Sequence, residues 1–221
     1  IISTEKLFVT EDYENFSKKF PFQLTDDQER AINDVILDLE TGKLMDRLIC
    51  GDVGFGKTEV ALRTSFILAN SGYQVALVAP TTILVKQHYK SFSERFKTTS
   101  LNISSLSRMT SLKDRNKIKN DLKTGEVNIV IGTHALLSND VDFNNLGLLI
   151  IDEEQHFGVA QKEKIKELQG NIHVLTLSAT PIPRTLQLSL SGLKQLSLIT
   201  TPPVNRLSIR TFVLELSLIH I

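Results

Sequence analysis

Short runs of apolar residues recur along the chain, each bounded by turn residues or by a charged residue. Five of them are continuous enough to predict strands buried on both faces of a sheet, over residues 47–50, 74–79, 127–132, 146–152 and 172–178. A sixth segment, residues 101–106, alternates between apolar and polar positions and predicts a further strand. Continuous rather than alternating strands favour a mostly parallel sheet.

Apolar residues at helical spacing separate these strands. Thr25 is a suitable N-cap, Gln28 completes a capping box three residues later, and Gly42 ends that helix. The alternation of strands and helices predicts an α/β fold, with helices on both faces of the sheet and ligands beyond the carboxyl ends of its strands. Further helices are predicted over residues 11–19, 57–70, 82–96, 112–123 and 158–168.

The first apolar strand runs into a glycine-rich segment with the phosphate-binding pattern G-x-x-x-x-G-K-T. Backbone N–H groups of such a loop, and of the helix that follows, surround an anion. We predict that Lys57 reaches the β- and γ-phosphates of ATP and that the Thr58 hydroxyl coordinates Mg²⁺. A chance match in a glycine turn is disfavoured by the strand and helix on either side. The loop comprises Gly51, Asp52, Val53, Gly54, Phe55, Gly56, Lys57 and Thr58.

Two carboxylates, Asp152 and Glu153, follow the most apolar strand of the chain. An acidic pair at the end of a buried strand is costly unless a cation or a partner satisfies it, and beside a phosphate loop that cation is Mg²⁺. Asp152 would hold the metal, and Glu153 would orient and deprotonate the attacking water. Taken alone, the segment is equally compatible with a solvated loop, and only the phosphate loop favours the catalytic interpretation.

Composition narrows the class without naming a function. The chain carries 25 basic and 25 acidic residues among 221, so no global field indicates nucleic acid and any DNA contact needs a local patch. The single cysteine, Cys50, excludes a disulfide within the chain, and no apolar run approaches the length of a membrane span. We therefore expect a cytoplasmic protein with no membrane partner.

Taken together, the segments resemble the signature motifs of the superfamily-two helicases and translocases, in the order found in that family. The resemblance implies a RecA-like P-loop NTPase lobe. Its elements are an adenine-reading element at Phe22, Thr25 and Gln28, motif I at 51–58, motif Ia at 79–82, a DNA-contacting motif at 131–134, motif II at 152–155 and motif III at 178–180.

A narrower resemblance is to the motor of the bacterial transcription-repair coupling factors. It rests on GDVGFGKTEVA, GTHALL, LLIIDEEQHFGV, LSATPIPRTL and the TPP at 201–203. RecG-type fork-remodelling helicases share DVGxGKT, FGV and TPIPRT and are the nearest alternative, although Phe55 and Glu59 favour the coupling factors. Gln155 stands where many relatives have histidine, and we expect coupling to survive that change.

The resemblance assigns a role to each motif residue. Gln28 and Phe22 would contact adenine, while Lys57, Asp152, Glu153 and Gln155 would carry the catalysis. Nucleotide state would be coupled to the DNA side through Ser178, Ala179 and Thr180, although a simple turn before a proline is the alternative there. A further group would bind DNA phosphates through backbone N–H groups and hydroxyls, contacts that do not depend on base sequence. These residues are Pro80, Thr81, Thr82, Gly132, Thr133 and His134.

The same resemblance implies partners beyond this chain. They are double-stranded DNA, a second RecA-like lobe, and RNA polymerase and nucleotide-excision repair proteins bound through modules not recognised here. The second lobe would supply an arginine finger, worth about 10³–10⁵ in rate in comparable systems. We therefore expect the first lobe of a translocase in transcription-coupled repair, with only trace ATP hydrolysis on its own. A nucleotide-gated DNA-binding module without motor activity is a second alternative.

The expected domain organisation follows from these assignments. Residues 1–19 form a lead-in segment, residues 20–200 the N-terminal RecA-like ATP-binding domain, and residues 201–215 an exit toward the second lobe. Two interpretations of the apolar tail, residues 214–221, stay open. It is either a strand of a following domain or, over residues 216–221, non-native sequence.

Overall fold

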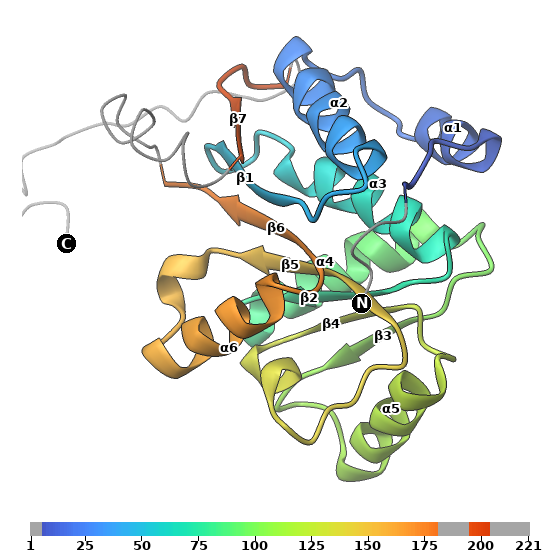
Figure 1. The fold of residues 1–221 in the computed structure, drawn as a ribbon, viewed down its shortest axis with the longest axis vertical. Helices are drawn as coiled ribbons and strands as arrows, with labels where there is room; N and C mark the ends of the chain where they lie inside the picture. Colours follow the sequence, from blue (N-terminus) through green and yellow to red (C-terminus); the bar gives the residue numbers. More distant parts are fainter. Residues whose placement is uncertain (1–5, 181–194, 204–221) are drawn as a thin grey trace, which may run out of the picture.

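The strands form one parallel sheet, in the order β3-β4-β2-β5-β6-β1-β7 (Figure 1). The computed structural model describes residues 6–180 and 195–203. The expected exit over 201–215, apart from 201–203, and the tail over 216–221 lie outside them. The strands are β1 (Asp46–Gly51), β2 (Gln74–Val78), β3 (Ile103–Leu106), β4 (Ile129–Gly132), β5 (Leu146–Asp152), β6 (His173–Ser178) and β7 (Gln195–Ile199). Every neighbouring pair among them is parallel.

Helices cover both faces of this sheet (Figure 1). The residues of β2 alternate between two cores: Val75 and Leu77 belong to one, and Ala76 and Val78 to the other. The first core is completed by α1 (Glu11–Lys18), α2 (Asp26–Glu40), α3 (Lys57–Asn70) and α4 (Thr82–Phe96). The second is completed by α5 (Leu112–Thr124) and α6 (Val159–Gln169). The predicted α/β fold is therefore confirmed.

Local sequence explains where several helices begin. Thr25 caps α2, and its hydroxyl and the Gln28 side chain form the predicted capping box. The hydroxyl of Thr81 accepts a hydrogen bond from the N–H of Leu84 and caps α4. Gly125 ends α5 in the left-handed conformation, as glycine does at many helix ends. The two threonines place the starts of α2 and α4, and Gly125 the end of α5, within a residue or two of the predicted positions.

Three short elements were not predicted. Strand β7 pairs with β1 at the edge of the sheet, and its five residues alternate, with only Ser197 and Ile199 buried. Such a short edge strand lacks the continuous apolar run that marks the central strands. Two 3₁₀ turns, His134–Leu137 and Glu154–His156, begin two positions after the last residues of β4 and β5.

The lead-in helix α1 packs onto the sheet domain. The ring of Phe16 stacks on that of Phe66 in α3, with 4.4 Å between centroids, and Tyr13 contacts the same ring. Leu7, Tyr13 and Phe16 are buried in the first core together with residues of α2 and α3. The helix predicted near 11–19 is thus present, and its apolar face contributes to the stability of the sheet domain.

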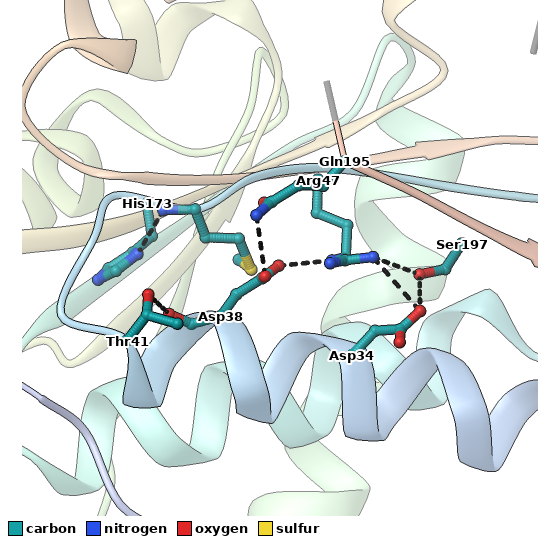
Figure 2. A network of polar contacts seen from close by, with 8 residues as sticks. Asp34, Asp38, Thr41, Arg47, His173, Gln195 and Ser197 are labelled. Atoms are coloured by element: carbon teal, nitrogen blue, oxygen red, sulfur yellow. Dashed lines mark hydrogen bonds and ion pairs between the residues drawn. The ribbon is translucent and has the colours of Figure 1, made fainter. Parts of the chain in front are cut away.

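A buried polar network joins α2, β1 and β7 on the first-core side of the sheet (Figure 2). The guanidinium of Arg47 donates to Asp38 Oδ2 at 2.6 Å and to the Ser197 hydroxyl at 2.8 Å. That hydroxyl donates to Asp34 at 2.7 Å, and the Gln195 amide donates to Asp38 Oδ1 at 2.9 Å. The network ties the edge strand to the strand that carries the phosphate loop.

His173, beside this network, accepts a hydrogen bond at Nδ1 from the N–H of Met45, at 3.0 Å (Figure 2). Burial lowers the pKa of His173 from 6.5 to about 4, against an opposing effect of Asp38. Since the folded pKa lies below the unfolded one, this group stabilises the fold above pH 6.5. The contribution is lost as the pH falls from 6.5 toward about 4.

We expect the free energy of unfolding of the wild-type chain to be lower near pH 5 than near pH 7, with a reduced difference in His173→Asn. Asparagine keeps an acceptor near the Nδ1 position but does not titrate. Urea denaturation of both proteins at the two pH values measures the difference. Equal pH dependence in the two proteins would rule out His173 as the responsible group.

Candidate nucleotide site

The predicted motif residues gather where the strands end. Gly51, Asp152 and Ser178 are the last residues of β1, β5 and β6, which are neighbours or near neighbours in the sheet. Since all strands are parallel, their carboxyl ends share one edge, the expected location of a ligand. A cleft of ≈ 460 Å³ opens at this edge and is called the phosphate cleft; its lining includes Gly54, Lys57, Thr58, His88, Asp152 and Glu153.

Two glycines shape the phosphate loop. Gly54 and Gly56 both have φ near +80°, a left-handed conformation that other residues rarely adopt. A Cβ at Gly56 would lie 2.3 Å from Gln28 Nε2, so a side chain has no room there. Gly56 is also the N-cap of α3, and the helix therefore starts directly at the loop with its free N–H groups directed at the anion position.

The ammonium group of Lys57 lies across the loop. It donates to the carbonyl oxygens of Gly51 at 2.6 Å and Asp52 at 3.1 Å. Burial lowers the pKa of Lys57, while the carboxylates of Glu153, Asp152 and Asp52 act in the opposite direction. A cation held by carbonyl oxygens next to two carboxylates is suited to bind phosphate oxygens.

Asp152 is buried, and its carboxylate is held from α4. Oδ2 lies 2.7 Å from Nε2 of His88, which is itself buried. A carboxylate only accepts, so Nε2 carries the proton of this hydrogen bond. Thr58 lines the same cleft, and one carboxylate with one hydroxyl fits Mg²⁺, which keeps several waters and takes its other ligands from phosphates. Among the described residues no cluster of three acidic, histidine or cysteine side chains offers a separate metal site.

Glu153 is held in an unusual backbone conformation, with φ 54° and ψ 56°. Among the described residues other than glycine, it alone has a positive φ. Its Oε1 accepts the N–H of Ala179 at 2.9 Å, and its Oε2 accepts the side-chain amide of Gln155. Backbone strain of this kind is common at active sites, and here the Glu153 carboxylate joins the Gln155 side chain to the backbone of Ala179.

The residues of the predicted motif III, 178–180, form hydrogen bonds with one another. The hydroxyls of Ser178 and Thr180 lie 2.7 Å apart, and the N–H of Thr180 donates to the Ser178 hydroxyl at 3.2 Å. Together with the bond from Ala179 to Glu153, this brings Gln155, Ser178, Ala179 and Thr180 into one hydrogen-bonded group. This group connects the Glu153 carboxylate to the end of β6, and a coupling role for its residues stays a prediction.

A second hollow of ≈ 650 Å³ adjoins the phosphate cleft and shares Gly54 and Thr58 with it; we call it the base pocket. Phe22, which is 61% exposed, and Gln28 both line it, and adenine binding by these two residues stays a prediction. The Gln28 side chain is already engaged, since Oε1 accepts the N–H of Thr25 at 3.0 Å and Nε2 donates to the carbonyl of Phe55 at 2.8 Å. Gln28 thus fixes the loop relative to α2.

Asp27 holds the last described residues of the chain against α2. One oxygen, Oδ2, accepts the backbone N–H and the hydroxyl of both Thr200 and Thr201, at 2.7 to 3.0 Å. These bonds, with the Thr200 hydroxyl contributing most, lower the pKa of Asp27 to about 2. The segment after β7 is therefore fixed next to Gln28 and the base pocket.

The residues predicted to follow DNA lie side by side at the same edge of the sheet. Ala79, the residue after β2, donates its N–H to the carbonyl of Gly132 at 2.9 Å. Thr81 and His134 are exposed, whereas Gly132 and Thr133 are buried. A Cβ at Gly132 would lie 2.4 Å from the carbonyl oxygen of Leu106, so this glycine permits close packing of β4. DNA contact by Pro80, Thr81, Thr82, Gly132, Thr133 and His134 stays a prediction.

Two side chains at the site were not found from the sequence. His88 contacts Asp152, and Arg95 donates to Glu59 at 3.3 Å while its guanidinium lies 4.3 Å from the centre of the Phe16 ring. The two residues lie seven positions apart on α4, so that they share a face of the helix. That seven-residue spacing could have indicated two side chains directed at the site, but it is equally compatible with a helix face packed in the core.

A glycine-rich loop at the end of β1, a carboxylate pair at the end of β5 and a parallel sheet that carries both define a RecA-like P-loop NTPase lobe. The chain belongs to the DEAD/DEAH box helicase family, whose model matches residues 25–189. Among the described residues, no helix is long and apolar enough to cross a membrane.

The chain is similar to transcription-repair-coupling factors from several bacteria. The transcription-repair-coupling factor of Rickettsia bellii is 58% identical, with 94% of this chain and 19% of that protein covered. The Escherichia coli factor is 50% identical, with 93% and 18% covered. Among solved structures, RecG bound to a three-way DNA junction matches with a TM-score of 0.80 and 37% identity, covering 94% of this chain and 28% of that one. The chain thus spans 17–19% of the length of the curated relatives.

Proposed function

We propose that the chain is the ATP-binding first lobe of a double-stranded DNA translocase that acts in transcription-coupled repair. The observation that carries the proposal is the phosphate cleft, where the side chains of Lys57, Asp152 and Glu153 line one cavity. Identities of 50–58% to transcription-repair-coupling factors support the assignment to that branch of the family.

In this proposal the motif residues at the phosphate cleft and the base pocket have distinct roles. Lys57 and the loop N–H groups bind the phosphates, and Thr58 and Asp152 hold Mg²⁺, which would neutralise charge on the phosphate oxygens. Glu153 orients the attacking water and takes its proton. Phe22 and Gln28 at the base pocket contact adenine. The hydrogen bond from Gln28 to the carbonyl of Phe55 links adenine binding in that pocket to the conformation of the phosphate loop. Gln155, Ser178, Ala179 and Thr180 couple the cleft to the DNA side.

The remaining parts of the motor lie outside this chain. A second RecA-like lobe would face the phosphate cleft and supply an arginine finger. Double-stranded DNA would pass along the edge that carries Thr81 and His134, and RNA polymerase and repair proteins would bind other modules of a cytoplasmic parent protein. Because the second lobe is needed for catalysis, we propose that the isolated chain binds ATP and hydrolyses it only at trace rates.

Replacing Lys57 by alanine tests this assignment. We expect Lys57→Ala to weaken binding of a fluorescent ATP analogue by about 100-fold, because a charge-assisted contact to phosphate is lost in a partly buried site. The matched control Lys86→Ala removes an exposed lysine of α4 and should bind like the wild type. Unchanged binding in Lys57→Ala would contradict the proposed site. Robust DNA-stimulated hydrolysis by the isolated wild-type chain would contradict the need for a second lobe.

A RecG-type fork-remodelling helicase is the second candidate, favoured by the TM-score of 0.80 to RecG. Sequence identity is lower for that protein, 37% against 50–58% for the coupling factors. The flanking sequence of the parent separates the two, since a polymerase-binding module favours the coupling factor and an oligonucleotide-binding wedge favours RecG. Binding without turnover in the two-lobed protein would instead favour a nucleotide-gated module.

A further inference from the structure

His88 is the hydrogen-bond partner of the Asp152 carboxylate within the described residues. The two side chains are 9% and 11% exposed, and the 2.7 Å contact joins α4 to the end of β5. Both line the phosphate cleft together with Lys57 and Thr58. A buried carboxylate can turn about its terminal torsion unless a neighbour fixes it, and His88 occupies Oδ2 so that Oδ1 is left for the cleft.

We propose that His88 is a positioning residue for the magnesium-binding carboxylate, an inference that rests on the proposed nucleotide site. Groups that hydrogen-bond a metal-binding carboxylate fix its orientation, and their loss typically weakens metal affinity by about 10- to 100-fold. In this role His88 acts through Asp152 and is not itself a ligand of the metal. It sets the direction in which Asp152 presents its second oxygen to the hydrated cation.

The position of His88 on α4 gives this contact a second consequence. The helix begins at Thr82, capped by Thr81, and these are two of the residues predicted to follow DNA. His88 lies six positions after Thr82, which corresponds to about 9 Å along the helix axis. A shift of α4 on binding DNA would therefore move the partner of Asp152 directly, without passing through the loop or motif III.

The test compares nucleotide binding with and without magnesium. A fluorescent, non-hydrolysable ATP analogue is titrated into the wild-type chain, His88→Ala and His88→Gln, once with saturating magnesium and once with EDTA. For His88→Ala we expect at least about 10-fold more magnesium to be needed for half-maximal tightening, and unchanged affinity in EDTA. Glutamine places an amide N–H near the former Nε2 and should restore the wild-type magnesium requirement to within a few-fold.

The outcomes separate this inference from the proposed function. If the wild type binds the analogue more tightly with magnesium and His88→Ala keeps the same magnesium requirement, the positioning role is wrong while the nucleotide site stands. If the wild type does not bind the analogue at all, the proposed function fails. An equal loss of affinity in magnesium and in EDTA, shared by His88→Gln, would assign His88 a purely structural role and overturn the inference.

Discussion

In the two-lobed parent protein, Glu153→Gln is expected to lower DNA-stimulated ATP hydrolysis by about 10²–10⁴-fold, the range over which a general base contributes. Glutamine has the shape of glutamate, so the acceptor for the N–H of Ala179 is kept, and the Gln155 amide can turn to offer its oxygen. The change removes the carboxylate that we propose takes the proton of the attacking water. Binding of ATP should therefore stay within a few-fold of the wild type.

The neighbouring residue provides the control for this prediction. Glu154→Gln makes the same chemical change one position away, on a side chain that does not line the phosphate cleft, and should retain nearly full hydrolysis. Steady-state hydrolysis with duplex DNA and binding of a non-hydrolysable analogue are measured for both variants. If Glu153→Gln hydrolyses ATP at the wild-type rate, or if Glu154→Gln is equally impaired, Glu153 is not the base.

The central strands and the phosphate loop could be predicted because their signals are local. The segment 146–152 is continuously apolar up to Asp152 and forms β5, which is buried along nearly its whole length. The pattern of residues 51–58 needs only its own glycines and the helix start at Lys57 to create an anion site. The capping box of Thr25 and Gln28 is likewise complete within four residues.

The contacts that fix the site could not be predicted, since they join residues distant in sequence. His88 and Asp152 lie 64 positions apart, and Asp27 lies 173 positions from Thr200. Each contact depends on which helix covers which strand, and a single histidine or aspartate carries no pattern that reveals it. The positive φ of Glu153 is a further example, because only the packing of motif II against β6 selects a conformation that its residue type disfavours.

Arg47→Ala is expected to lower the free energy of unfolding of the chain by about 3–5 kcal/mol, the cost of removing one partner of a buried ion pair. The guanidinium and the Asp38 carboxylate are each 10% exposed and 2.6 Å apart (Figure 2). Without Arg47, Asp38 keeps the amide of Gln195 but loses its counter-charge, and Ser197 loses one of its two partners. The edge strand β7 would be held less firmly.

Urea denaturation of Arg47→Ala measures this cost, with Lys18→Ala as the control. Lys18 pairs with Glu14 at 4.0 Å, but the side chains are 74% and 62% exposed, so its loss should cost less than about 1 kcal/mol. Arg47→Lys should fall between them, because it keeps the charge but cannot reach Asp38 and Ser197 together. If Arg47→Ala costs no more than Lys18→Ala, the network does not stabilise the fold. Strand β7 would then be held by its backbone pairing with β1 and by the bonds from Thr200 and Thr201 to Asp27.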